Sequence, residues 1–213
     1  MKRYNEREFS VRRVSPLRKF WNFLKKDTWQ SWVVSLILLV LIIRFVIFPT
    51  LSFLTGSSLP LVVVESCSMY HDSNFDDWWS KNSEWYESKS ITKEQFASFS
   101  LKNGFNKGDI IFVWGRSEIK LGNVIIFEPN VESIAQYPII HRVVTLSPIS
   151  TKGDNGRTNP GQLVKGTNSK HLDETNISQE QIIGRAVFRI PALGWVKLII
   201  FQPFKQADGL FCS

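Results

Sequence analysis

The feature that most restricts how this chain can fold is the apolar run WVVSLILLVLIIRFVIF at residues 32–48. Fourteen of its seventeen residues are Leu, Ile, Val or Phe. As a helix rising about 1.5 Å per residue, the run spans roughly 25 Å, and its apolar flanks complete the ~30 Å of a bilayer core. Arg44 lies near the far end, where its side chain can reach the interface. We therefore predict a transmembrane anchor over residues 29–54.

The charges around this run predict its orientation. Residues 1–27 carry nine Lys or Arg and three acidic residues, which is +6 of the total net charge of +7. Because Lys and Arg stay on the cytoplasmic side, we expect a basic cytoplasmic tail at 1–28 and an extracytoplasmic domain after the anchor. The run is longer than that of a cleaved signal peptide, and no clear A-x-A site follows it. The remaining chain is almost neutral, which argues against a nucleic-acid-binding surface.

Most of the chain beyond the anchor has the pattern of strands. The segments LPLVVVESCSM, GDIIFVWG, GNVIIFEP and YPIIHRVVTL are apolar, rich in β-branched residues and bounded by Gly, Pro or Asn. Residues 180–200 are expected to return to a strand after a long polar loop at 151–176. We predict a mainly β domain over residues 55–71 and 107–200, followed by a tail at 201–213.

Residues 72–106 differ from their surroundings because aromatic residues recur there at near-helical spacing. Thr92 and Gln95 fit a capping box that opens a short helix. We predict a Trp-rich helical insertion, which could form a small satellite core, an aromatic foot in the membrane interface or a cap over a cleft.

Two cysteines, Cys67 and Cys212, are too few for a disulfide framework. A single bridge and two free thiols are both compatible with the sequence.

The candidate reactive segment is ESCSMYH, residues 65–71. A serine attacks a carbonyl only when a base accepts its proton and donors stabilise the oxyanion. His71 follows in a turn-like stretch, where side chains rarely converge on a serine three residues away, and His171 lies in a polar loop. His141, on a half-buried strand, is better placed as a base, although alone it could equally be structural.

Asp154, in TKGDNG, fits either a turn or an acid that orients a histidine. The His and Cys residues lack metal-ligand spacing, and the chain has no phosphate-binding loop motif, so neither a metal nor another cofactor is expected.

The order of these motifs is informative. An anchor is followed by VVVESCSMYH, GDIIFV, GNVIIF, IIHRVV, TKGDN and IIGRAVFRIPALGW. This series resembles type I signal peptidase, peptidase family S26, in the archaeal and endoplasmic-reticulum branch that has histidine where the bacterial branch has lysine. The resemblance covers roughly residues 30–71 and 107–200.

The resemblance implies a role for each matching residue. Ser68, before Met69, would be the nucleophile and His141 the general base. Ser66 would stabilise the oxyanion together with the backbone N–H of Ser68. Asp154 would orient His141. The extended substrate would pair with the strand before the nucleophile, through Val62, Val63, Val64 and Glu65.

Four departures from the family pattern affect this assignment. Cys67 replaces a usual glycine, and His71 stands where proline is common. A second important acid is expected six residues after Asp154, where this chain has Pro160. The next acids are Asp173 and Glu174, so Asp173 is kept as the alternative residue that orients His141. The fourth departure is the insertion, which is not part of the family pattern.

The expected function is a membrane-bound serine endopeptidase that removes signal peptides at Ala-x-Ala sites through an acyl-enzyme. It would be a single-pass protein of the cell membrane. The expected partners are signal peptides of preproteins, membrane lipid and the protein translocation machinery, without nucleic acid. The alternative is a non-catalytic, membrane-anchored binding domain whose working surface is the Trp-rich insertion.

Overall fold

Two compact units, Met1–Thr50 and Leu51–Ser213, make up the chain. The computed structural model describes residues 15–201 and Cys212. Half of the predicted tail at 1–28 and nearly all of the predicted tail at 201–213 therefore lie outside the described residues.

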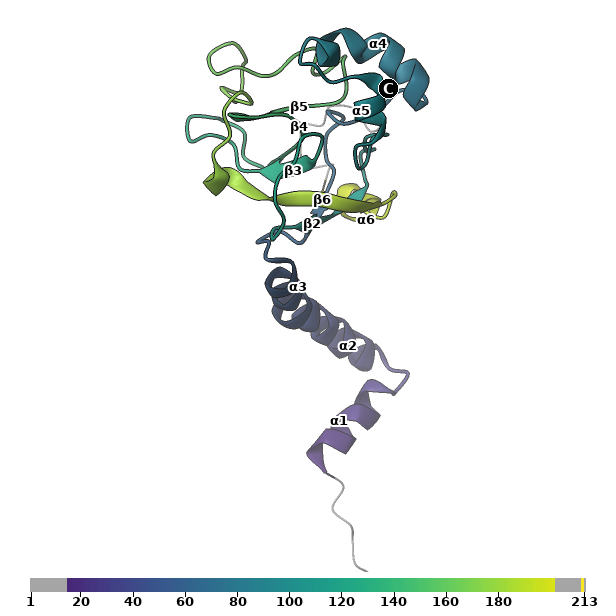
Figure 1. Cartoon of the computed structure of the whole chain (residues 1–213). Helices are drawn as coiled ribbons and strands as arrows, with labels where there is room; N and C mark the ends of the chain where they lie inside the picture. Colours follow the sequence, from purple (N-terminus) through teal and green to yellow (C-terminus); the bar gives the residue numbers. More distant parts are fainter. Residues whose placement is uncertain (1–14, 202–211, 213) are drawn as a thin grey trace, which may run out of the picture. The chain divides into compact units, whose positions relative to one another are not determined.

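The N-terminal helices are α1 (Pro16–Leu24), α2 (Trp29–Ile42), the π-helical turn η1 (Ile43–Ile47) and α3 (Phe48–Thr55). Figure 1 labels α1, α2 and α3. The last three form one helix, Trp29–Thr55, with the length and apolar composition of a membrane span. Only 6% of its most apolar window is buried. Since a folded protein rarely leaves so much contiguous apolar surface in water, this helix matches the predicted anchor.

The π turn has a local cause. Phe48 donates its N–H to the carbonyl of Ile43, five residues earlier. Pro49 follows immediately, and a proline inside a helix has no N–H to donate and crowds the preceding turn. A wider turn at this place accommodates the proline within a continuous helix.

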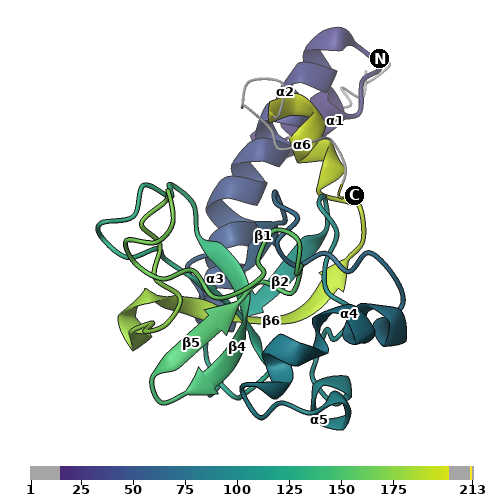
Figure 2. The same cartoon turned by 90° about the horizontal axis from the view of Figure 1, so that it is seen from above.

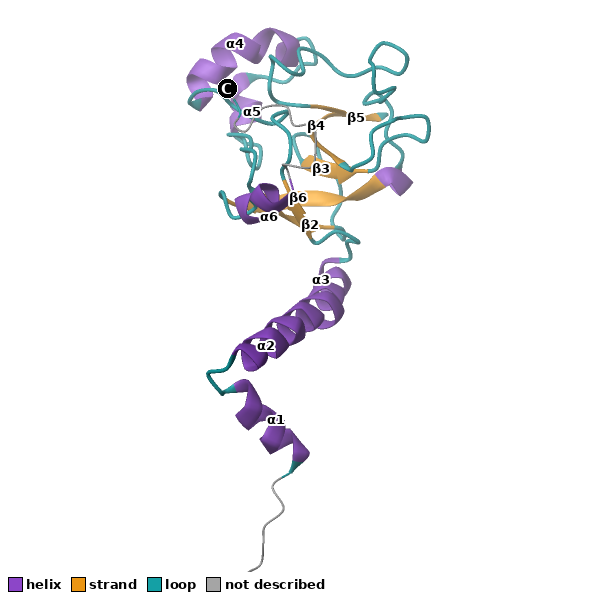
Figure 3. Cartoon of the chain, turned by 180° about the vertical axis from the view of Figure 1, so that it is seen from behind, coloured by secondary structure: helices purple, strands orange, loops and turns teal. Residues whose placement is uncertain are grey.

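A six-stranded antiparallel sheet forms the centre of the second unit. Figures 2 and 3 show this sheet from two directions. Its spatial order is β1-β2-β6-β3-β4-β5, so β1 and β5 are its edges. The strands are β1 (Leu61–Val63), β2 (Ile110–Trp114), β3 (Val124–Phe127), β4 (Ile139–Leu146), β5 (Ile149–Lys152) and β6 (Ile182–Ile190). Five of these strands lie within the predicted strand segments.

Three details differ from the predictions. Helices hold more of the described residues than strands do, so "mainly β" describes the sheet-based domain better than the whole chain. The sequence predicts a polar loop for part of β5, because Ser150, Thr151 and Lys152 are polar, although the structure buries all three. Beyond β6 the chain forms helix α6 (Trp195–Phe201), since Pro191 and the left-handed φ of 58° at Ala192 end the strand.

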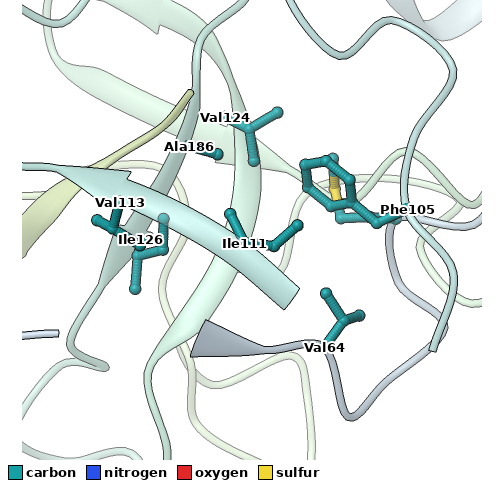
Figure 4. Packing of buried hydrophobic residues seen from close by; sticks show 8 residues of the cluster. Val64, Phe105, Ile111, Val113, Val124, Ile126 and Ala186 are labelled. Atoms are coloured by element: carbon teal, nitrogen blue, oxygen red, sulfur yellow. The ribbon is translucent and has the colours of Figure 1, made fainter. Parts of the chain in front are cut away.

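The core lies on both faces of β3, whose four residues are all buried. Val124 and Ile126 pack with Ile111, Val113, Ala186, Phe105, Val64 and Met69, most of which Figure 4 labels. Ile125 and Phe127 point to the other face, where they pack with Val143 and Ile177. The two-residue period of the strand thus divides the core into two layers.

The insertion contains α4 (Phe75–Glu87) and α5 (Lys93–Ala97). The predicted cap is present, because the Thr92 hydroxyl accepts the N–H of Gln95. Trp78, Trp79 and Tyr86 are buried in a cluster with Ile91, Phe96 and Val144. The insertion is therefore a satellite core, and the hypothesis of a membrane-interface foot is wrong for the two buried tryptophans.

Candidate active site

The segment with Ser66 and Ser68 is anchored at its far end by Met69. The Met69 side chain is 1% exposed and packs in the core, while its carbonyl accepts the N–H of Phe105 at 2.8 Å. The Met69 sulfur accepts the N–H of Asp154 at 3.4 Å. These buried contacts fix the position of the backbone segment that contains Ser66 and Ser68.

Asn155 holds the same segment through two further hydrogen bonds. Its backbone N–H donates to the carbonyl of Ser68 and its side-chain amide to the carbonyl of Cys67, both at 2.9 Å. A Cβ on Gly153 would lie 2.7 Å from the Ser68 carbonyl oxygen, which is closer than real side chains approach. The TKGDN motif therefore needs glycine before Asp154 so that it can pack directly against the serine segment.

Ser66 and Ser68 share one face of this segment, with their hydroxyl oxygens 3.2 Å apart. Ser66 is exposed and Ser68 is partly buried. An approaching carbonyl would therefore meet two neighbouring hydroxyl groups, of which one can attack while the other donates a hydrogen bond.

His141 lies on β4 and is 4% exposed. Its Nδ1 is hydrogen-bonded to the carboxylate of Glu174, which is fully buried. The same carboxylate accepts the backbone N–H of Leu163 at 2.7 Å and the hydroxyl of Thr151 at 3.3 Å. With an acceptor fixed at Nδ1, the proton of a neutral imidazole stays there and Nε2 keeps its lone pair. This arrangement suits a general base.

The acid at His141 differs from the two expected residues. Asp154 lies instead with Arg142, and Asp173 accepts the N–H and hydroxyl of Thr175. Since neighbouring strand residues point to opposite faces, the side chain of Arg142 leaves β4 on the other side from His141. The expected Asp154–His141 contact is therefore corrected to Glu174–His141.

From the sequence we name Glu174 but keep its neighbour Asp173 as the alternative acid, because both lie in a long polar segment without a motif that distinguishes them. The segment folds back so that Thr151 donates its N–H to the Glu174 carbonyl at 2.9 Å. The available signal was the pair of apolar residues that flank it, Leu172 and Ile177, which are 1% and 3% exposed. Such residues indicate that a polar loop returns to the core.

A second buried cluster lies on the other face of β4, around Asp154. Its carboxylate accepts hydrogen bonds from Arg142, from Tyr86 and from Nε2 of His71. Burial by itself would raise the pKa of Asp154, but the charge of Arg142 and the hydrogen bonds from His71 and Arg142 hold it well below its usual value. Asp154 is therefore an ionised, structural carboxylate.

The insertion covers this charged cluster with aromatic rings. The Arg142 guanidinium lies 4.8 Å from the Phe96 ring centroid, and the His71 ring stacks on Trp78 at 3.9 Å. Lys152 lies 5.1 Å from the rings of both Trp85 and Tyr86. Burial lowers the pKa of Lys152 to about 8, although Asp154 and Glu174 act in the opposite direction. The charges of Arg142 and Lys152 are therefore stabilised by π faces as well as by carboxylates.

The predicted substrate-binding residues lie along β1 and directly after it. Val62 and Val63 belong to this edge strand, and the backbone of Val64 continues the pairing through Asp109 and Gly108. The Val64 side chain is buried in the core, and the Glu65 carboxylate pairs with Lys197 at 2.9 Å. Since Val64 uses both its backbone N–H and its carbonyl on the β2 side, the strand can offer a substrate only those backbone groups that face away from β2.

Comparison with known proteins identifies the family. No family model matches the chain. The signal peptidase complex catalytic subunit SEC11 of Scheffersomyces stipitis is 31% identical over 125 residues, covering 54% of this chain and 70% of the relative. The chain belongs to the family of signal peptidase catalytic subunits. SEC11 of Eremothecium gossypii and of Colletotrichum graminicola are 32% and 29% identical, and this chain spans 63% and 61% of their lengths.

In this signal peptidase family member, Cys67 stands where the family pattern leads us to expect glycine. Cys67 forms a disulfide with Cys212, with Cα atoms 5.4 Å apart. The side chain that replaces a glycine is thus directed into a cross-link, and its carbonyl still accepts the N–H of Tyr70 at 3.1 Å. Of the two states that the sequence left open for the cysteines, the structure has the bridge.

Proposed function

We propose that this member of the signal peptidase family is a membrane-anchored serine endopeptidase that removes N-terminal signal peptides from exported preproteins. The observation that supports it best is the buried hydrogen bond between His141 and Glu174 on the strand that carries the HRVV motif. A carboxylate placed there stabilises the imidazolium that forms when histidine takes a proton from serine.

In the proposed reaction, Nε2 of His141 accepts the proton of Ser68 while Oγ attacks the carbonyl carbon at the cleavage site. The imidazolium then gives this proton to the leaving amine, and the peptide bond breaks to leave an ester on Ser68. A water molecule, deprotonated by the same histidine, attacks the ester. Its collapse releases the signal peptide and returns the proton to Ser68.

Ser66 is the proposed side-chain donor to the oxyanion. Its hydroxyl lies 3.2 Å from that of Ser68, so both can approach the same carbonyl group. The backbone N–H of Ser68 would supply the second donor. Loss of one such donor typically lowers kcat by about 10²–10³.

The edge strand β1 is the proposed binding strand for the signal peptide. An extended segment would lie along Val62, Val63, Val64 and Glu65 and would bond to those backbone groups of the strand that face away from β2. Family resemblance implies small residues at the first and third positions before the cut, the Ala-x-Ala preference.

The proposed location is a membrane crossed once by the helix Trp29–Thr55, with the basic N-terminus cytoplasmic and the catalytic domain outside. The expectation from the sequence was the cell membrane. Lipid and preproteins are then direct partners. The relatives are named as catalytic subunits of a signal peptidase complex, so we include further subunits and the translocation machinery among the proposed partners.

The alternative of a non-catalytic binding domain loses its main arguments. It depended on the departures at Cys67 and Pro160 and on an exposed Trp-rich surface. The disulfide gives the Cys67 side chain a structural use, and Glu174 provides a carboxylate for His141 in place of the acid expected at position 160. Trp78 and Trp79 are buried and cannot form an exposed surface.

The test is processing of a model preprotein by the full-length chain in membranes. Ser68→Ala and His141→Ala should each abolish cleavage, because nucleophile and base act as a unit. Ser88→Ala, which alters an exposed serine of the insertion, is the matched control and should cleave normally. Processing at the wild-type rate by Ser68→Ala would exclude this nucleophile.

A further inference from the structure

A cavity of about 310 Å³ opens beside the serine segment. Three parts of the chain line it: the residues after Met69, helix α4 of the insertion and the turn after Asp154. The lining residues are Tyr70, Asp72, Trp78, Lys81, Asn82, Asn155, Gly156 and Arg157. Its volume is that of a small ligand pocket.

This cavity is rigidly connected to Ser68. Tyr70 is two residues further along the chain, which is at most about 7 Å between Cα atoms. Asn155 lines the cavity and also donates its backbone N–H to the Ser68 carbonyl. A group bound in the cavity would therefore have a fixed position relative to the attacking oxygen.

The direction of the substrate leads into the cavity. If the signal peptide lies along residues 62–65 with its scissile carbonyl at Ser68, the chain after the cut must leave beyond Ser68. Tyr70 and Asp72 follow Ser68 in the chain, and both line the cavity. The first residues of the mature protein would meet these walls.

The rim of the cavity is positive. Lys81 and Arg157 share a single carboxylate, Asp72, at 3.2 and 3.3 Å. Both cations are more than half exposed, so they can turn toward a second anion. Two exposed cations that share one carboxylate favour a ligand that carries negative charge.

We propose that this cavity is a subsite for the mature side of the preprotein and that it selects an acidic side chain in the first residues after the cut. The proposal rests on the proposed peptidase function and assigns a task to the insertion, since Trp78, Lys81 and Asn82 come from α4. The signal peptide would then bind along β1, and the first residues of the mature sequence would bind in the cavity.

The experiment measures kcat/KM for preproteins that differ only in the second and third mature residues, which are both Glu, both Gln or both Lys. Wild type should cleave them in that order, with about two- to fivefold per step, the size expected for exposed charge pairs. Lys81→Glu/Arg157→Glu should reverse the order. Lys93→Glu, which breaks the ion pair with Asp76 on the same insertion, is the matched control and should keep it.

The outcomes separate the two proposals. Normal cleavage by wild type with the same rate for all three substrates overturns the subsite and leaves the peptidase function in place. An order that survives unchanged in the double variant overturns it as well. Failure of wild type to cleave any of the three, together with failure on an unmodified preprotein, overturns the peptidase function itself. The wild-type ranking needs no variant, so a folding defect cannot obscure it.

Discussion

The sharpest test of the site is Glu174→Gln, which changes charge and hydrogen bonding with almost no change in volume. Glu174 uses both carboxylate oxygens, one for the N–H of Leu163 and the other for His141 and Thr151. Glutamine has one acceptor oxygen, so either Leu163 or His141 must face an amide NH₂. A buried donor left without an acceptor costs about 1–3 kcal/mol, and we expect a loss of stability of that size.

The effect on catalysis should be larger than the effect on folding. If the NH₂ faces His141, the imidazole takes the other tautomer and Nε2 can no longer accept the serine proton. If it faces Leu163, the tautomer is kept but the imidazolium loses its counter-charge. Either way we expect kcat to fall by about 10²–10⁴, or roughly 3–5 kcal/mol of transition-state stabilisation.

The assay is single-turnover cleavage of a preprotein by the detergent-solubilised full-length enzyme, far below its melting temperature. Thermal unfolding of the same samples measures the stability term separately. Asp173→Asn is the matched control, since it alters the neighbouring acid whose partner is Thr175. The reasoning fails if Glu174→Gln keeps kcat within about threefold while Asp173→Asn loses it, because Asp173 would then be the orienting acid.

Two further predictions concern stability. In the folded protein the pKa of Lys152 is lowered from 10.5 to about 8, so between these pH values the unfolded chain binds more protons than the folded chain. The unfolding free energy should therefore rise by about 2–3 kcal/mol from pH 8 to 10. Lys152→Met should lack this rise when thermal unfolding is followed against pH, and an identical rise in the variant would refute the assignment. Cys67→Gly and Cys212→Ser should each lower the unfolding free energy by about 2–4 kcal/mol through loss of the disulfide. The double variant should lose no more than either single variant, because the same bridge is lost. A reductant should lower the unfolding free energy of the wild type by the same amount and leave the variants unchanged. Cys67→Gly should still cleave preproteins at low temperature, and a complete loss of activity there would assign the bridge a direct role in the reaction.

Much of the fold could be predicted because its signals are local. The anchor follows from one apolar run, and the strands β2, β3 and β4 follow from β-branched segments between turn residues. The helix after β6 was missed because WVKLII is as apolar as a strand. The end of the strand is set by the backbone at Pro191 and Ala192, so that WVKLII forms a helix instead of continuing β6.

The site was predictable only where short motifs carry it. Ser66, Ser68 and His141 stand in such motifs, whereas Glu174 reaches His141 through a loop whose course depends on tertiary packing. The sequence could not exclude Asp154 either, because its partner Arg142 is next to His141 in the chain but on the opposite face of β4.

The TKGDN motif therefore has a structural task that differs from the expected one. Asp154 binds Arg142, the residue after His141 on β4, while the next residue, Asn155, binds the carbonyls of Ser68 and Cys67. Two consecutive residues thus connect the strand of the proposed base with the segment of the proposed nucleophile. Removal of Asp154 would leave Arg142 buried without a counter-charge, which typically costs 3–5 kcal/mol. A loss of activity in such a variant would report a displaced serine segment, and it says nothing about proton transfer at His141.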